Sequence, residues 1–140
     1  MARIMCFDYG SKRIGIAVTD ELKIIASPLS TCLSHEVFTF IDSYNIDYPI
    51  EKFVVGMPVD LKGRDTDATK RTKDFIKVLK NKYSDIPTET YDERYTSRIA
   101  KDAILLMGKN KKYRRTKSNV DKISASIILQ SYLKRNQLWY

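Results

Sequence analysis

The chain has 140 residues, of which 43% are hydrophobic and 30% are charged, a composition typical of one globular domain with a substantial core. It contains no long uncharged apolar stretch and no signal-peptide pattern, so we expect a cytoplasmic protein that neither crosses nor binds a membrane. The net charge of +8 favours a polyanionic partner such as nucleic acid, although many basic domains bind nothing in particular.

Residues 4–19 consist of two apolar runs separated by turn residues, and this pattern predicts a β-hairpin. Asp8 falls at the end of the first strand, close to Gly10, where the backbone permits close approach of a ligand. A carboxylate in this position is a candidate metal or phosphate site. The hairpin alone leaves a second explanation equally open, in which Asp8 only begins an Asx-type turn.

The rest of the chain alternates between short apolar runs and helical patterns. After the hairpin we expect a strand at 24–29 and a helix that is capped by Ser34 and ends near Asn45. A strand at 52–58, an amphipathic helix at 68–83 and a strand at 88–93 follow. The last two elements are a helix capped by Thr96 or Ser97 and ended by Gly108, and an apolar helix capped by Ser118 or Asn119. This order predicts an α/β protein with a mixed five-stranded sheet flanked by helices. The first three strands would be antiparallel, and strands one, four and five parallel. No repeat or linker interrupts the pattern, so we expect residues 1–140 to form a single domain.

Acidic residues recur at the predicted carboxyl edge of this sheet, where ligand sites form in open α/β sheets. Asp8 ends the first strand, Asp92 and Glu93 end the fifth, and Asp121 lies in the first turn of the last helix. Three converging acids would repel one another unless cations neutralised them. Mg²⁺ or Mn²⁺ prefers oxygen ligands, and a pair of such ions supports phosphodiester cleavage.

Each acid also has a simpler explanation. Asp121 could satisfy the dipole of its helix, and Glu93 could form a salt bridge with Arg94 or Arg98. Each of these is commoner than catalysis when taken alone. The coincidence of three acids at one edge favours a metal site.

Basic residues surround the predicted site. The segment 109–117 contains no acid and lies just before the last helix. It is either a surface for backbone phosphates or simply a solvated charged loop. The candidate nucleic-acid-binding residues are Lys12 and Arg13 in the hairpin turn, Arg94, and Lys111, Lys112, Arg114, Arg115 and Lys117 in the basic segment. We expect Arg94 and Lys117 to contact the scissile phosphate.

Four blocks of the sequence resemble the YqgF (RuvX) family: residues 8–17 (DYGSKRIGIA), 55–58 (VGMP), 92–97 (DERYTS) and 120–133. They occur in the family's order and span nearly the whole chain. The resemblance implies a ribonuclease-H-like fold related to that of Holliday-junction resolvases. The family's members are described as nucleases that mature the 5′ end of the 16S ribosomal RNA precursor. The resemblance also implies that Asp8, Glu93 and Asp121 are the catalytic acids that bind Mg²⁺ or Mn²⁺.

One position departs from the wider superfamily. Junction resolvases place their second acid at the end of strand four, where this chain has Gly56, so the acid would have to come from Glu93, with Asp92 as a possible substitute. The main hypothesis is a nuclease acting on structured precursor rRNA or a ribosomal particle, as a monomer or weak dimer. The alternatives are a resolvase of branched DNA, which normally needs a dimer, and a non-catalytic RNA-binding ribosome-assembly factor.

Overall fold

The computed structural model describes residues 2–60, 62–96 and 117–136, and within the last of these segments it describes side chains from residue 122 onward. The elements are β1 (Arg3–Tyr9), β2 (Arg13–Thr19), β3 (Ala26–Leu33), the 3-10 turn η1 (Ser34–Glu36), α1 (Val37–Asp47), β4 (Ile50–Met57), α2 (Asp67–Lys82), β5 (Thr88–Asp92), the 3-10 turn η2 (Glu93–Tyr95) and α5 (Lys117–Asn136). The helix expected between Thr96 and Gly108 lies almost entirely outside the described residues. No helix in the described ranges is long and apolar enough to cross a membrane.

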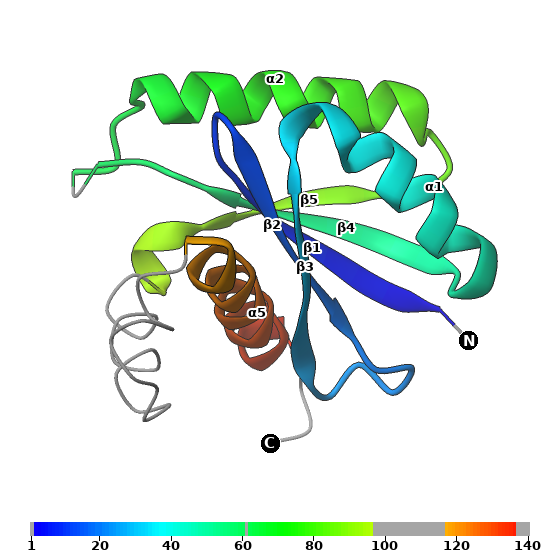
Figure 1. The fold of residues 1–140 in the computed structure, drawn as a ribbon. Coiled ribbons are helices and arrows are strands. Elements are labelled where there is room, and N and C mark those ends of the chain that lie inside the picture. Colours follow the sequence, from blue (N-terminus) through cyan, green and yellow to red (C-terminus); the bar gives the residue numbers. More distant parts are fainter. Residues whose placement is uncertain (1, 61, 97–116, 137–140) are drawn as a thin grey trace.

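The five strands form one mixed sheet in the order β3-β2-β1-β4-β5. The pairs β1–β2 and β2–β3 are antiparallel, and β1–β4 and β4–β5 are parallel, which confirms the predicted arrangement. Figure 1 shows α1 and α2 on one face of the sheet and α5 on the other. The central strands β1 and β4 are therefore covered on both faces, and this explains why their sequences are nearly continuous apolar runs.

Alternation along the strands divides the core into two clusters. On the α1/α2 face, Phe7 and Phe53 pack with Phe75 and other aliphatic and aromatic side chains. The Phe7 and Phe75 rings meet edge to face with centroids 5.5 Å apart. On the α5 face, Cys6 and Val54 belong to a second cluster with the apolar residues of α5.

Polar contacts fix the position of α5 on the sheet. Lys52 on β4 donates to the Tyr132 hydroxyl at 3.0 Å and forms an ion pair with Glu89 on β5 at 3.2 Å, while the Tyr132 hydroxyl donates to Glu89. The side chain of Gln130 accepts from the Ala26 amide at 3.0 Å. With the helix held in this way, its first turns lie toward η2 (Figure 1).

Two predicted helix caps are wrong. Strand β3 continues to Leu33 because its pairing with β2 does, so Ser34 begins η1 and α1 is preceded by Glu36 without a side-chain cap. The Ser34 hydroxyl instead donates to the Ser11 carbonyl at 3.0 Å. The final helix begins at Lys117, so Ser118 and Asn119 lie inside it rather than at its cap.

Candidate functional site

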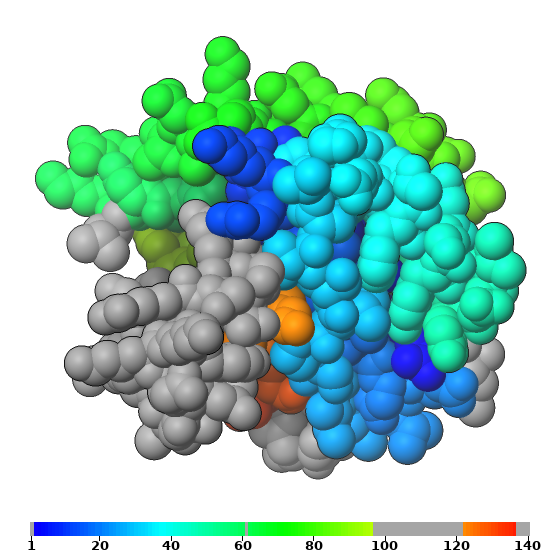
Figure 2. Space-filling model, viewed as in Figure 1, coloured from blue at the N-terminus to red at the C-terminus, as the bar shows by residue number. Residues whose placement is uncertain are grey.

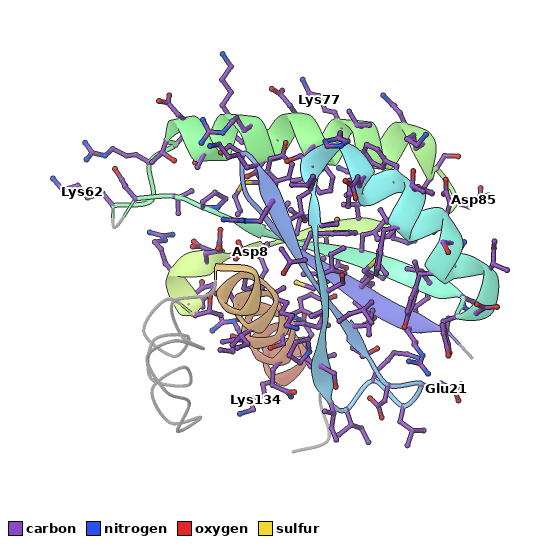
Figure 3. The ribbon with its side chains drawn as sticks, viewed as in Figure 1. Asp8, Glu21, Lys62, Lys77, Asp85 and Lys134 are labelled. Atoms are coloured by element: carbon purple, nitrogen blue, oxygen red, sulfur yellow. The ribbon has the colours of Figure 1, made fainter. Side chains whose placement is uncertain are left out.

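Asp8 lies at the carboxyl end of β1, on the face covered by α5. Strand alternation places it on the same face as Cys6, two residues earlier, and opposite to Tyr9. Figure 3 shows Asp8 at the end of β1 nearest η2 and the start of α5. At the same edge β4 contributes Gly56, which pairs with Tyr91 of β5. The edge therefore brings together the segments in which the acids were predicted.

Glu93 is the first residue of η2 and lies directly after β5. The carboxylate of Asp92 caps this turn by accepting from the Arg94 amide at 2.9 Å. The Thr96 amide and hydroxyl both donate to the Glu93 carbonyl, at 3.0 and 3.1 Å. The backbone of Glu93 is thus held on both sides by short-range hydrogen bonds.

The side chain of Glu93 extends over β4 and occupies the space above Gly56. A Cβ atom at position 56 would lie 3.1 Å from Glu93 Cγ, 3.2 Å from Glu93 Cδ and 2.9 Å from Ile128 Cδ1. These distances leave little room for a side chain on this residue of β4. At the end of β4, where an acid was expected from the comparison with resolvases, this chain therefore has a glycine covered by an acid from the neighbouring segment.

The carboxyl groups of Asp8 and Glu93 are in direct contact. Burial raises the pKa of Glu93 to about 8, and the charge of Asp8 and a hydrogen bond between the two side chains act in the same direction. Burial, followed by the charges of Asp8 and Glu93, also raises the pKa of the Cys6 thiol well above its usual range. With this pKa, Glu93 keeps its proton at neutral pH in the cation-free protein, as expected when two acids share one site.

This acid pair has the chemistry of a partial site for a hard divalent cation. Carboxylate oxygens are the ligands that Mg²⁺ and Mn²⁺ prefer, and a cation would relieve the repulsion that the shared proton now relieves. Within residues 2–60, 62–96 and 122–136, no three His, Cys, Asp or Glu side chains are grouped so that they could hold a metal ion. The two acids therefore fit a metal and need at least one further ligand.

Asp121 remains the predicted third ligand. It belongs to α5, and helical periodicity puts its position on the same face as Ala125 and Ile128, which are buried against the sheet. Ile128 lies beside Gly56 and Glu93. Position 121 lies about 10 Å from position 128 along the helix axis, toward the N-terminal end of α5. Its side chain lies outside the described part of the chain.

Arg94 and Asp92 form a clamp beside the acid pair. Arg94 Nε and Nη2 lie 2.9 and 2.6 Å from Asp92 Oδ2, and this contact holds the pKa of the Asp92 carboxyl below its usual value. The ion pair with Arg94 that was considered for Glu93 is thus made by Asp92, and the alternative partner Arg98 lies outside the described residues. Because Asp92 already has a cationic partner, it is a poorer substitute ligand than Glu93.

The clamp also reaches the loop after β4. Gly63 has a φ of +80°, and a Cβ atom there would lie 2.9 Å from Arg94 Nη1. In the same loop Asp60 accepts from Arg64 Nε at 2.7 Å. This role of Arg94 was not predicted from the sequence. The available signal was its spacing from Asp92, since an aspartate two residues upstream commonly caps a turn.

The predicted phosphate-binding residues are only partly described. Lys12 is exposed in the β1–β2 turn, whereas Arg13 is half-buried. Figure 2 shows this turn, in dark blue, projecting at the surface between α2 and α1. Gly10 closes the turn, because a Cβ atom there would lie 2.6 Å from the Arg13 carbonyl oxygen. The remaining candidates, Lys111, Lys112, Arg114 and Arg115, lie outside the described residues, as does the side chain of Lys117.

Comparisons with known proteins place this site in a wider context. Relatives named "Putative pre-16S rRNA nuclease" include one from Amoebophilus asiaticus, which is 44% identical over 140 residues covering 100% of this chain and 99% of the relative. Another, from Phocaeicola vulgatus, is 45% identical and covers 96% of each chain.

Solved structures agree with the fold. Thermus thermophilus RuvC in complex with a Holliday junction substrate matches with a TM-score of 0.55 and 11% identity, over 96% of both chains. The Fowlpox virus resolvase in complex with Holliday junction DNA matches with a TM-score of 0.53 and 12% identity, over 95% of this chain and 97% of the other. At such low identity these similarities concern the fold, which is that of ribonuclease-H-like resolvases.

A family model described as RuvX, Holliday junction resolvase, matches residues 2–135. This match covers almost the whole chain and agrees with the full-length relatives. The chain belongs to the RuvX family.

Proposed function

We propose that the protein is a metal-dependent nuclease that cleaves phosphodiester bonds in the precursor of 16S rRNA, near its 5′ end. The observation that carries the proposal is the direct contact between Asp8 and Glu93 at the carboxyl edge of the sheet, together with the raised pKa of Glu93. The names of the full-length relatives support the choice of substrate.

Asp8, Glu93 and Asp121 would hold Mg²⁺ or Mn²⁺ in this proposal. A bound divalent cation would lower the pKa of a water molecule and stabilise charge on the phosphate oxygens. Asp8 and Glu93 must lose their shared proton for this role, and Glu93 is kept over Gly56 by the hydrogen bonds of η2. The Asp92–Arg94 clamp would position the turn that carries Glu93.

Phosphates of the RNA would be bound by basic residues around this edge. Lys12 lies in the exposed turn that follows β1, and each phosphate neutralised by such a cation releases counterions and adds to affinity. Lys111, Lys112, Arg114, Arg115 and Lys117 would extend the same surface. We place the reaction in the cytoplasm and propose that the protein acts as a monomer or weak dimer.

A second candidate is cleavage of branched DNA. The family description and the RuvC fold favour it. It differs from the first candidate in the substrate rather than in the acids, and normally needs two active sites presented by a dimer.

The test compares the wild type with Asp8→Asn on three substrates: 16S rRNA precursor, single-stranded RNA and a four-way DNA junction. Each is incubated with and without Mg²⁺ or Mn²⁺, and the product ends are mapped. We expect metal-dependent cleavage of the precursor near its 5′ end, lowered by Asp8→Asn at least about 100-fold. The exposed Asp85→Asn is the matched control, with unchanged cleavage expected.

Equal cleavage by the wild type and Asp8→Asn would contradict the proposal. Cleavage of the junction alone would replace the precursor with branched DNA as the substrate. Binding of the precursor without any cleavage, unchanged in Asp8→Asn, would support the non-catalytic assembly factor instead.

A further inference from the structure

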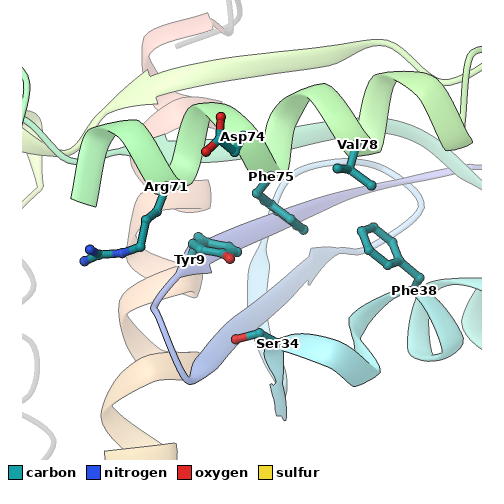
Figure 4. Close-up of a pocket in the computed structure, with 7 residues that line it drawn as sticks. All are labelled: Tyr9, Ser34, Phe38, Arg71, Asp74, Phe75 and Val78. Atoms are coloured by element: carbon teal, nitrogen blue, oxygen red, sulfur yellow. The ribbon is translucent and has the colours of Figure 1, made fainter. Parts of the chain in front are cut away.

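A pocket lies on the face of the sheet opposite the acid pair, at the same edge. It has a volume of about 260 Å³ and is formed where the end of β1, the β3–α1 junction and α2 meet. Figure 4 shows Tyr9 at one end of this pocket, Phe38 and Val78 at the other, and Phe75 between them. Three segments that are distant in sequence thus combine their aromatic rings in one concave surface.

The aromatic wall is already held in place by the core. Phe75 is only 6% exposed and forms the floor. Its ring centroid lies 4.6 Å from that of Tyr9 and 6.1 Å from that of Phe38. Val78 at the rim is 42% exposed. A flat ring entering the pocket would meet preformed aromatic surface, which is the geometry used to stack single bases.

The charges around the pocket favour a neutral ring over a phosphate. Arg71 and Asp74 both line it, so one cation is offset by one anion, and Asp74 would repel a phosphate. Ser34 adds a hydroxyl on the opposite wall (Figure 4), which donates to the Ser11 carbonyl and can accept one hydrogen bond through its oxygen. A heteroaromatic base has polar edges that such groups can bind, whereas a purely aliphatic ligand has none.

The position of the pocket relates it to the acid pair. Asp8 and Tyr9 are consecutive residues of β1, about 3.8 Å apart at Cα, and their side chains belong to opposite faces of the sheet. A nucleic-acid strand whose phosphate lies at Asp8 would pass around the end of β1, by way of the β1–β2 turn, to place a neighbouring base at Tyr9. Lys12 lies in the exposed turn between the two faces, where its positive charge can bind the phosphates of the nucleic-acid strand that connects the two sites.

From this geometry we propose that the Tyr9–Phe38–Phe75 pocket binds one unpaired nucleobase adjacent to the phosphate held at the acid pair. The inference rests on the proposed nuclease function, because it takes the acid pair as the phosphate site. It specifies the substrate further: the strand must be single-stranded, or open, next to the cleavage position. A paired base would have to leave its stack before it could enter, at a cost in unstacking energy.

The test measures binding rather than cleavage, with full-length protein in EDTA and no divalent metal. The probes are a single-stranded RNA oligonucleotide, a blunt duplex of the same sequence, and the single strand with one 2-aminopurine. The variant Val78→Trp fills the pocket from its exposed rim. Ile46→Trp is the matched control, since Ile46 is an exposed apolar residue of α1 outside the pocket.

We expect Val78→Trp to weaken single-strand binding about 5- to 100-fold, the range for loss of one stacked base. Its duplex binding should stay within about twofold of the wild type, and Ile46→Trp should change neither. Quenching of 2-aminopurine fluorescence on binding to the wild type should be lost in Val78→Trp. Tyr9→Leu should reproduce the weakening, and Tyr9→Phe, which keeps the ring, should restore binding to near the wild-type level.

Equal effects of Val78→Trp and Ile46→Trp, or equal weakening of single strand and duplex by Val78→Trp, would overturn the inference. So would the absence of single-strand binding by the wild type. These outcomes are separate from those of the Asp8→Asn cleavage test. If Asp8→Asn leaves cleavage unchanged while Val78→Trp selectively loses the single strand, the base pocket stands and the catalytic role of the acid pair fails.

Discussion

The end of β1 contributes an aromatic ring to one face of the sheet and a carboxylate to the other. On the α1/α2 face, Tyr9 packs against Phe75, and the aromatic contacts continue into a large apolar cluster. On the α5 face, Asp8 meets Glu93 above a glycine, and burial raises the pKa of Glu93. Strand alternation lets β1 supply both. At this strand end, the α1/α2 side therefore adds to the apolar core, whereas the α5 side holds an acid pair that destabilises the cation-free protein.

The largest expected effect on stability belongs to the aromatic face. Replacing Phe75 by alanine removes a buried ring that contacts Phe7, Tyr9 and Phe38, and should lower the free energy of unfolding by about 3–5 kcal/mol. Urea denaturation measures this change. Val78→Ala, at an exposed position of the same helix, is the control and should cost less than about 1 kcal/mol. Similar losses for both variants would show that the aromatic cluster is not central to stability.

On the acid face, a substitution is expected to raise the free energy of unfolding rather than to lower it. The pKa of Glu93 is about 8 in the folded protein and about 4.3 in an unfolded chain. Between these values the unfolded state releases a proton that the folded state keeps, so stability falls as pH rises and the full penalty is present above pH 8.

Glu93→Gln removes this penalty. Without metal, it should therefore raise the free energy of unfolding by about 2–4 kcal/mol at pH 9 and change it little at pH 4. Denaturation curves at the two pH values measure the difference. Asp85→Asn, at an exposed site, should show no such pH-dependent gain. A loss of stability for Glu93→Gln at pH 9 would mean that the acid pair is not strained.

Gly56 tests how closely the acid face is packed. A methyl group there would lie 2.9 Å from Ile128 Cδ1 and 3.1 Å from Glu93 Cγ, so Gly56→Ala should cost about 1–3 kcal/mol and displace Glu93. Calorimetric titration with Mn²⁺ should show weaker binding than in the wild type. If Gly56→Ala binds Mn²⁺ with unchanged affinity, the placement of Glu93 over β4 does not matter for metal binding.

The smallest effect on stability is expected at the clamp. Arg94 and Asp92 are partly exposed, so solvent screens their ion pair and Arg94→Gln should change the free energy of unfolding little. If the clamp positions η2, Mn²⁺ affinity should nevertheless fall, and Arg94→Lys should restore only part of it because lysine lacks the planar fork. Arg64→Gln is the control in the neighbouring loop. Equal Mn²⁺ affinities for Arg94→Gln and Arg64→Gln would show that Arg94 does not position η2 for metal binding.

Much of the fold could be predicted from the sequence, because the length of each apolar run and the turn residues between them are local signals. The antiparallel pairing of the first three strands followed from their tight connections, and strands one, four and five were expected to be parallel. The prediction of a Ser34 cap failed because pairing of β3 with β2 extends the strand to Leu33, and strand pairing is a long-range contact that local capping preferences do not include.

The site was predictable in part. Asp8 was identifiable as an acid at a strand end, but the sequence alone left Asp92 and Glu93 as alternatives. They are distinguished by the contact of Asp92 with Arg94 and by the position of the Glu93 side chain over Gly56, and both depend on tertiary structure. The aromatic pocket was not foreseen, because Phe38 and Phe75 each read as ordinary core residues of their own helix. The role of Asp121 as a ligand remains a prediction.

The most direct test of the acid pair is an NMR titration of the Glu93 side-chain carboxyl carbon in wild-type protein, without metal and with Mg²⁺. The account predicts a midpoint near pH 8 without metal, a lower midpoint in Asp8→Asn, and a lower midpoint in the wild type when Mg²⁺ is added, because the cation competes with the shared proton. A midpoint near the ordinary value of about 4.3, unaffected by either Asp8→Asn or Mg²⁺, would contradict it.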